Sequence, residues 1–231
     1  MNLNKSELIA EVRKNYKDPE GLELFQLPET LRSNVNEAKR LITNFSNEAT
    51  IPNTIETFYT LREHHTMNGD IALAGSCVIN GKNIIVCSPQ VVFGKIDLNT
   101  IRALFIHELI HLTSDGGIFL DTDVNEALTE ISSFVIQKNF LDPNDMPVCF
   151  PNYKEQVHEV LPILKKSKIA PNVVVTEFLN KNTNRVFFKE NFPDLYPLTI
   201  ESMLGKIFNY KVRNEVLDFG NILALTISVK I

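Results

Sequence analysis

The chain has 231 residues, a net charge of −5 and 44% hydrophobic residues. This length and apolar content suffice for one domain with a full core, alone or with a helical extension. The acidic balance, without a basic stretch that carries interleaved aromatics, argues against nucleic acid as a partner. The amino terminus lacks the apolar core of a signal peptide and no stretch is apolar enough to span a bilayer, so we expect a cytoplasmic protein without a membrane partner. Export by a route that needs no cleaved signal stays open.

Residues 1–68 are predicted to be a helical region. Three helix starts place a cap residue or a proline ahead of a glutamate: Asn4 with Glu7, Pro28 with Glu29, and Asn53 with Glu56. His64 and His65 then fall at the end of the third helix. Because adjacent side chains on a helix diverge by about 100°, we interpret the pair as a charged last turn and not as a metal site.

The next stretch has the signal of a β-hairpin. Two β-branched segments, 71–79 and 82–87, flank Asn80 and Gly81, and this dipeptide is typical of a tight turn between strands. Pro89 then ends the second strand, because proline cannot donate a hydrogen bond to a sheet.

An apolar segment, 101–113, carries the motif His107-Glu108-Leu109-Ile110-His111. On a helix with about 3.6 residues per turn the two histidines project from one face, where both imidazoles can hold one zinc ion. Glu108 lies on the same side of the helix, where it can take a proton from a zinc-bound water without being a ligand. A buried set of this kind costs several kcal/mol unless a metal or other partners satisfy it.

A second helix is predicted over 121–138. Glu126 and Glu130 are four positions apart on it and share a face. The glycines within 114–117 permit a reversal that brings this helix back against the first. A catalytic zinc needs a third protein ligand, which either glutamate can supply. The alternative is that Asp123 and Glu126 form a capping pair at the helix start.

Together these helices resemble the gluzincin metallopeptidases of thermolysin type. In that family the second helix opens with Asn-Glu and carries another carboxylate four residues later, as in Asn125-Glu126-Ala127-Leu128-Thr129-Glu130. The resemblance covers about residues 101–138. It implies a full set of roles: His107, His111 and Glu126 as zinc ligands, Glu108 as general base, and Glu130 as the carboxylate that orients a ligand histidine.

Two features of the spacing bear on this resemblance. The separation between His111 and Glu126 is shorter than in thermolysin, which keeps Glu130 as the alternative ligand. The metzincin family does not fit, because Ser114 and Gly117 stand where its longer motif has a glycine and a third histidine.

The resemblance also implies a fold. We expect an α+β, zincin-like core at 69–141, with a small mixed sheet whose edge hairpin packs on the motif helix. In zincins such an edge strand binds extended substrate; an ordinary packing hairpin is the alternative. The proline-rich stretch 141–147 is the predicted boundary to a mainly helical region, 142–231.

The carboxy-terminal region has predicted helices near 152–161, 173–181 and 198–210, and an apolar end, 222–229, that suits a strand or a buried helix. A cluster of lysines reads as a solvated helix end: Lys165, Lys166 and Lys168. The three cysteines are odd in number and lack Cys-x-x-Cys spacing, so we expect free buried thiols and no structural zinc site: Cys77, Cys87 and Cys149.

Peptide hydrolysis also needs a donor for the oxyanion, which thermolysin-like enzymes supply from a Tyr or His after the ligands. Tyr153 and His158 are the candidates, although a tyrosine here also suits a core anchor and a histidine a surface position; Tyr196 and Tyr210 are further ones. We therefore expect a metallopeptidase with Zn²⁺ as cofactor and a peptide or protein as substrate. The alternatives are a zinc-site module that binds peptide without cleaving it, and a structural domain without metal.

Overall fold

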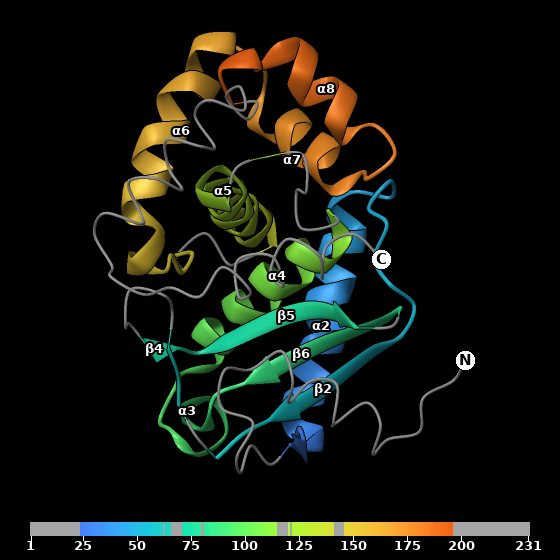
Figure 1. Ribbon diagram of the computed structural model, residues 1–231, viewed down its shortest axis with the longest axis vertical. Helices are drawn as coiled ribbons and strands as arrows, with labels where there is room; N and C mark the ends of the chain where they lie inside the picture. The colour runs from blue at the N-terminus through green and yellow to red at the C-terminus, as the bar shows by residue number, and fades with distance from the viewer. Residues whose placement is uncertain are drawn as a thin grey trace, which may run out of the picture.

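The structure, a computed structural model, describes residues 24–61, 63–65, 71–79, 81–114, 120, 122–140 and 146–195. It is an α+β fold that is mostly helical and contains a small mixed sheet of four strands in the order β1-β2-β6-β5. Figure 1 shows the sheet in one half of the molecule and helices α5 to α8 in the other, with α4 between them.

The sheet combines parallel and antiparallel pairs. The central strands β2 (Ile55–Tyr59) and β6 (Lys82–Cys87) run parallel, whereas β1 (Phe25–Gln26) and β5 (Ala74–Ile79) run antiparallel to their neighbours. β5 is an edge strand of this sheet. A separate two-stranded sheet pairs His64–His65 (β3) with Ile71–Ala72 (β4).

The predicted hairpin is confirmed, with one break. A bend at Leu73 divides its first segment into β4 and β5, and β5 then pairs with β6 from Ala74 opposite Cys87 to Ile79 opposite Lys82. Gly81 in the turn has φ of 76°, a left-handed conformation that glycine adopts without steric cost.

The helix predicted from Asn53 to the two histidines is wrong. The stretch forms β2, because its β-branched and aromatic residues fit a buried sheet better than a helix, and pairing with β6 outweighs the local cap signal. Glu56 pairs with Lys82 across the two strands, at 2.8 Å between Oε1 and Nζ. His64 and His65 lie in β3 and not at a helix end. The start predicted at Asn4 lies outside the described residues.

Most of the helices lie close to predicted positions. Those that carry or surround the site are α2 (Glu29–Phe45), α4 (Leu98–Thr113), α5 (Thr122–Phe140), α6 (Lys154–Ser167), α7 (Pro171–Leu179) and α8 (Asn184–Asn191). A 3₁₀ turn, Pro151–Tyr153, precedes α6, and a second, Pro193–Leu195, follows α8. The sequence did not predict α8 or the short α3 (Pro89–Phe93). The elements predicted at 198–210 and 222–229 lie outside the described residues.

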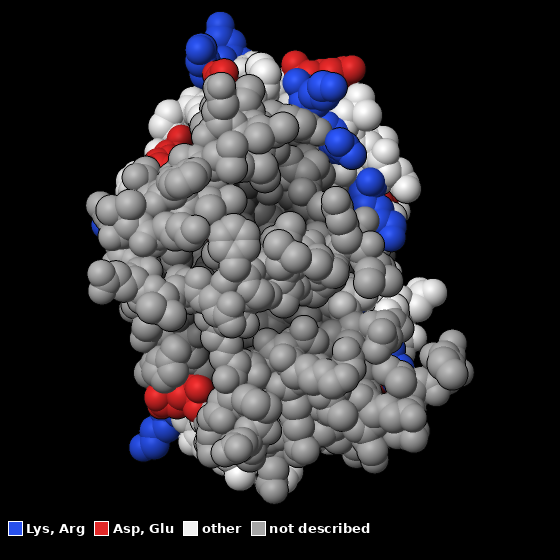
Figure 2. Space-filling model, in the orientation of Figure 1, with Lys and Arg blue, Asp and Glu red and all other residues white. Residues whose placement is uncertain are grey.

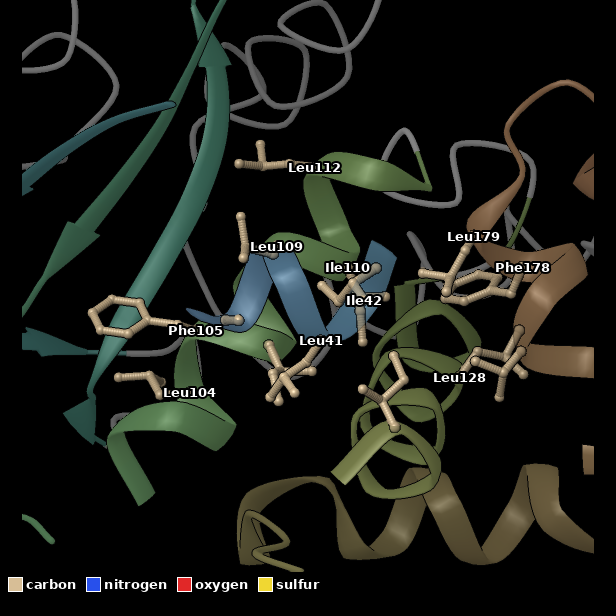
Figure 3. Packing of buried hydrophobic residues seen from close by; sticks show 14 of the residues in the cluster. Leu41, Ile42, Leu104, Phe105, Leu109, Ile110, Leu112, Leu128, Phe178 and Leu179 are labelled. Atoms are coloured by element: carbon tan, nitrogen blue, oxygen red, sulfur yellow. The ribbon is translucent and has the colours of Figure 1, made fainter. Parts of the chain in front are cut away.

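Helix α4 is the centre of the hydrophobic core. Figure 3 shows its apolar side chains between the sheet, α2 and α5, with Phe178 and Leu179 of α7 beyond α5. Phe105 is fully buried, and burial of an aromatic or aliphatic side chain of this kind contributes about 1.5–3 kcal/mol. One hydrophobic cluster contains residues from all three predicted regions, 1–68, 69–141 and 142–231; Leu31, Leu104 and Phe178 are examples. The position of α4 is therefore fixed from several sides.

Lys and Arg side chains gather at the end formed by α6, α7 and α8 (Figure 2). They include the predicted solvated helix end, whose three lysines are exposed at the last turn and cap of α6. Within the described ranges, no helix has the length and apolar character needed to cross a bilayer.

Candidate metal centre

Helix α4 presents the two motif histidines side by side. Asp97 caps the start of this helix, and its carboxylate accepts hydrogen bonds from the backbone N–H groups of Asn99 and Thr100, both at 3.0 Å. Helical spacing then places His107 and His111 one turn apart on one face. Their ring centroids are 4.9 Å apart and their Nε2 atoms 3.2 Å apart.

Helix α5 brings a carboxylate to the same point. Glu126 Oε2 lies 3.4 Å from Nε2 of His107 and 3.2 Å from Nε2 of His111. Zinc bound at 2.0–2.1 Å in tetrahedral geometry separates its ligand atoms by about 3.3–3.4 Å. The three donor atoms thus form a triangle of the size that one such ion requires.

Glu130 lies on the far side of His107. Its Oε2 is 3.0 Å from Nδ1 of His107, and a carboxylate can only accept, so Nδ1 carries the proton and donates. In the neutral imidazole this leaves the lone pair of Nε2 directed toward Glu126. The geometry therefore separates the two glutamates: Glu126 faces both Nε2 atoms, and Glu130 orients one ring from behind.

His111 has polar neighbours behind it as well. Its Nδ1 lies 3.3 Å from Nδ2 of Asn125 and 3.5 Å from Oγ1 of Thr129, while Oδ1 of Asn125 is buried without a hydrogen bond. A 180° rotation of the Asn125 amide lets Oδ1 accept from the Nδ1–H of His111 and satisfies both groups. That histidine then also directs the lone pair of Nε2 toward Glu126.

Because the site is buried, bringing the carboxylates and the histidine lone pairs together costs free energy unless a positive charge lies between them. His107 is only 1% exposed and Glu130 3%. Burial lowers the pKa of His107, but the neighbouring carboxylates of Glu126 and Glu130 outweigh it and hold that pKa well above its ordinary value. Burial raises the pKa of Glu126, yet the two histidines lower it far below its usual range. The arrangement thus holds a proton tightly, and the same donors can hold a metal cation.

Glu108 follows His107 on α4, and its negative charge helps to raise the pKa of that histidine. Glu108 is 5% exposed and has no hydrogen-bond or ion-pair partner among the residues that the structure describes. Burial, together with the negative charge of Glu108, raises the pKa of the Cys77 thiol on β5 to about 11. The Glu108 carboxylate therefore has no described partner that would prevent it from accepting a proton, and it belongs to the helix that packs against β5.

Tyr153 is brought to the site and His158 is not. The Tyr153 ring stacks on His107 with centroids 4.8 Å apart and 17° between the ring planes. Burial, and the negative charges of Glu126, Glu108 and Glu130, raise the pKa of the Tyr153 hydroxyl, so it keeps its proton. His158 is exposed on α6, which leaves only its surface role. Tyr196 and Tyr210 lie outside the described residues.

Sequence reasoning missed part of the surroundings. Thr129 and Asn125 each precede a site glutamate by one position, so the same helical spacing could have placed them beside His111. Phe150 had no such signal, because its backbone N–H donates to Glu130 Oε1, at 2.6 Å, from twenty positions away. The three cysteines are free, as predicted, but only Cys87 is fully buried, and Cys149 is exposed.

Comparison of the chain with protein-family models, with curated proteins and with solved structures found no match. The class of the site therefore rests on its residues and their geometry.

Proposed function

We propose that this protein is a zinc-dependent metallopeptidase with a zincin-like core of gluzincin type. The observation that carries the proposal is the triangle of Nε2, Nε2 and Oε2 atoms from His107, His111 and Glu126, with sides of 3.2–3.4 Å. Among the described residues these three form a group whose ligand atoms lie within 4.8 Å of one another.

The donor set favours a catalytic zinc. Structural zinc sites have four protein ligands, whereas catalytic sites have three and keep one position open. Two imidazoles and a carboxylate also suit iron(II) in oxygenases. The carboxylate of Glu108 has no hydrogen-bond partner among the described residues. It favours hydrolysis, because hydrolysis requires a proton acceptor next to the metal.

The roles of the residues follow from their places. When bound, zinc would act as a Lewis acid that polarises the scissile carbonyl and lowers the pKa of water toward about 7. Glu108 accepts the proton from the attacking water and passes it to the leaving amine. Tyr153 keeps its hydroxyl proton and donates a hydrogen bond to the oxyanion. Glu130 holds His107 in the tautomer that presents Nε2.

The edge strand supports a peptide as substrate. β5 packs against α4 and pairs with β6 on one side only, so the backbone groups of its other side are available within the described sheet. An extended peptide can add to such an edge through main-chain hydrogen bonds. The substrate would then lie along β5, next to Glu108.

The test is zinc content together with turnover. Purified protein should hold close to one zinc per chain by elemental analysis, and His111→Ala should lose it. Zinc-loaded wild type should cleave members of a diverse peptide library, and a chelator should stop the cleavage. Tight zinc without any cleavage would favour the peptide-binding module, and no zinc uptake would favour the metal-free domain, in which a protonated His107 sits between two glutamates.

A further inference from the structure

Residues 146–153, here called the strap, are tied to α5 by two side chains of that helix. Gln137 holds Val148 at both backbone groups: the N–H of Val148 donates to Oε1 at 2.9 Å, and Nε2 donates to the carbonyl oxygen of Val148 at 3.0 Å. Glu130, seven positions earlier, accepts from the N–H of Phe150 at 2.6 Å. Residues seven positions apart share a helix face, so the hydrogen bonds that Gln137 and Glu130 make with the strap lie on one side of α5.

The far end of the strap covers His107. The ring of Phe150 meets the imidazole edge-on, with centroids 6.0 Å apart and 85° between the planes, and Tyr153 stacks on its face. Glu130 connects the two, because one of its oxygens holds the strap and the other holds Nδ1 of His107. A change in the position of the strap must therefore change the surroundings of this histidine.

Among the described residues, Gln137 forms hydrogen bonds with Val148 and Ser133 and not with the donor triangle, yet it is only 3% exposed. A buried amide is costly unless it is fully hydrogen-bonded, and this one is satisfied by Val148 and by Oγ of Ser133. Without Gln137, the N–H and C=O groups of Val148 lose this partner. The amide therefore serves to fix the strap and not to fill the core.

We infer that Gln137 is a positioning residue for the metal centre. By holding the strap at Val148, it places Phe150 and Tyr153 against His107 and keeps the carboxylate of Glu130 in place behind the ring. The inference rests on the proposed zinc site. Because coupling between two events is reciprocal, zinc binding must also hold the strap more tightly on α5.

Two measurements test this coupling. The first is hydrogen–deuterium exchange, read by mass spectrometry, of peptides that cover 146–153 in the metal-free and zinc-loaded protein. The second is zinc affinity, measured by competition with a chromophoric chelator, for wild type and Gln137→Met. This substitution keeps the length of the side chain but removes both of its hydrogen bonds to Val148. Zinc should slow exchange in the strap, and Gln137→Met should speed exchange there and weaken zinc roughly tenfold, the lower end of effects for groups behind a ligand.

Two control variants separate this effect from general loss of stability. Asn139→Leu changes an exposed amide of the same helix whose hydrogen bond within the described residues is to the Val135 carbonyl oxygen, and Val175→Ala removes buried atoms of α7, away from the strap. Both should bind zinc like wild type. If Gln137→Met does not fold, the comparison of wild type with and without zinc decides alone.

The outcomes distinguish the two proposals. Wild type that binds zinc normally, with strap exchange unchanged by the metal and undiminished affinity in Gln137→Met, would overturn the positioning role and leave the zinc site standing. Wild type that binds no zinc would overturn the proposed function and this inference with it.

Discussion

At the scale of single residues, two glutamates of the candidate site, Glu126 and Glu130, have different contacts although the sequence does not distinguish them. Both lie on one face of α5, four positions apart. Only Glu126 reaches the Nε2 atoms of the two histidines, whereas Glu130 lies 3.0 Å from Nδ1 of His107. A ligand and a group that orients a ligand contribute differently to metal affinity, so substitutions separate them.

Glu126→Ala should abolish stoichiometric zinc binding, because it removes one of three donors. Glu130→Ala should keep the site and weaken zinc by roughly 10–100-fold. Elemental analysis and chelator competition measure both. The opposite ranking of the two variants would make Glu130 the ligand.

Tyr153 combines a ring that packs on His107 with a hydroxyl that can act in the reaction. Tyr153→Phe keeps the stacked ring, so it should bind zinc like wild type while peptide hydrolysis falls roughly 10²–10³-fold, the usual effect of losing one oxyanion donor. His158→Ala is the matched control and should be neutral, because that side chain is exposed on α6. Equal activity of Tyr153→Phe and wild type would remove the tyrosine from the mechanism.

At the scale of elements, the placement of α4 depends on its beginning as well as on its core. Asp97 caps the helix, and its hydrogen bonds to the hydroxyl and the backbone N–H of Thr100 lower the pKa of its carboxyl. A carboxyl whose pKa is lowered by folding stabilises the fold above its unfolded pKa of about 3.9, and that contribution is lost as pH falls through the folded value.

Asp97→Ala should therefore lower Tm at pH 7, and the difference from wild type should shrink as the pH is taken below about 4. Asp97→Asn keeps a cap acceptor without the charge and should show a smaller loss at pH 7, which also shrinks at low pH because wild type loses the contribution of its charge there. Differential scanning calorimetry between pH 3 and 7 measures both variants. A gap between wild type and Asp97→Ala that stays constant over this range would show that the carboxylate does not stabilise α4 through its charge.

The elements near the motif could be predicted from sequence because their signals are local. The four-residue spacings of His107 and His111, and of Glu126 and Glu130, depend only on helical periodicity. β2 could not be predicted in the same way, because the cap spacing of Asn53 and Glu56 favours a helix locally while the pairing with β6, far along the chain, decides the outcome. The same holds for the strap, whose contacts with Glu130 and Gln137 join distant backbone and side-chain atoms.

At the scale of the whole molecule, the candidate metal centre lies where the half with the sheet meets the helical half (Figure 1). α4 packs on β5, and α5 packs on α4, α6 and α7, so a metal held between α4 and α5 would link both halves. A ligand that binds only the folded protein stabilises it in proportion to the logarithm of its concentration over Kd.

Zinc should therefore raise Tm, with about 4 kcal/mol of added stability at a concentration a thousand times Kd. Thermal unfolding with and without a chelator measures the shift, and His107→Ala is the control that should show none. Equal Tm in both conditions for wild type would mean that zinc does not bind the folded chain.

The central claim is that Glu108 takes a proton in peptide hydrolysis at a zinc site. The most direct test is one assay of zinc content and peptide cleavage in Glu108→Gln, which keeps the shape of the side chain but cannot accept the proton. The variant should keep its fold and one zinc per chain while hydrolysis falls by about 10²–10⁴-fold, the range of general-base contributions. Cleavage at the wild-type rate by zinc-loaded Glu108→Gln would contradict the account.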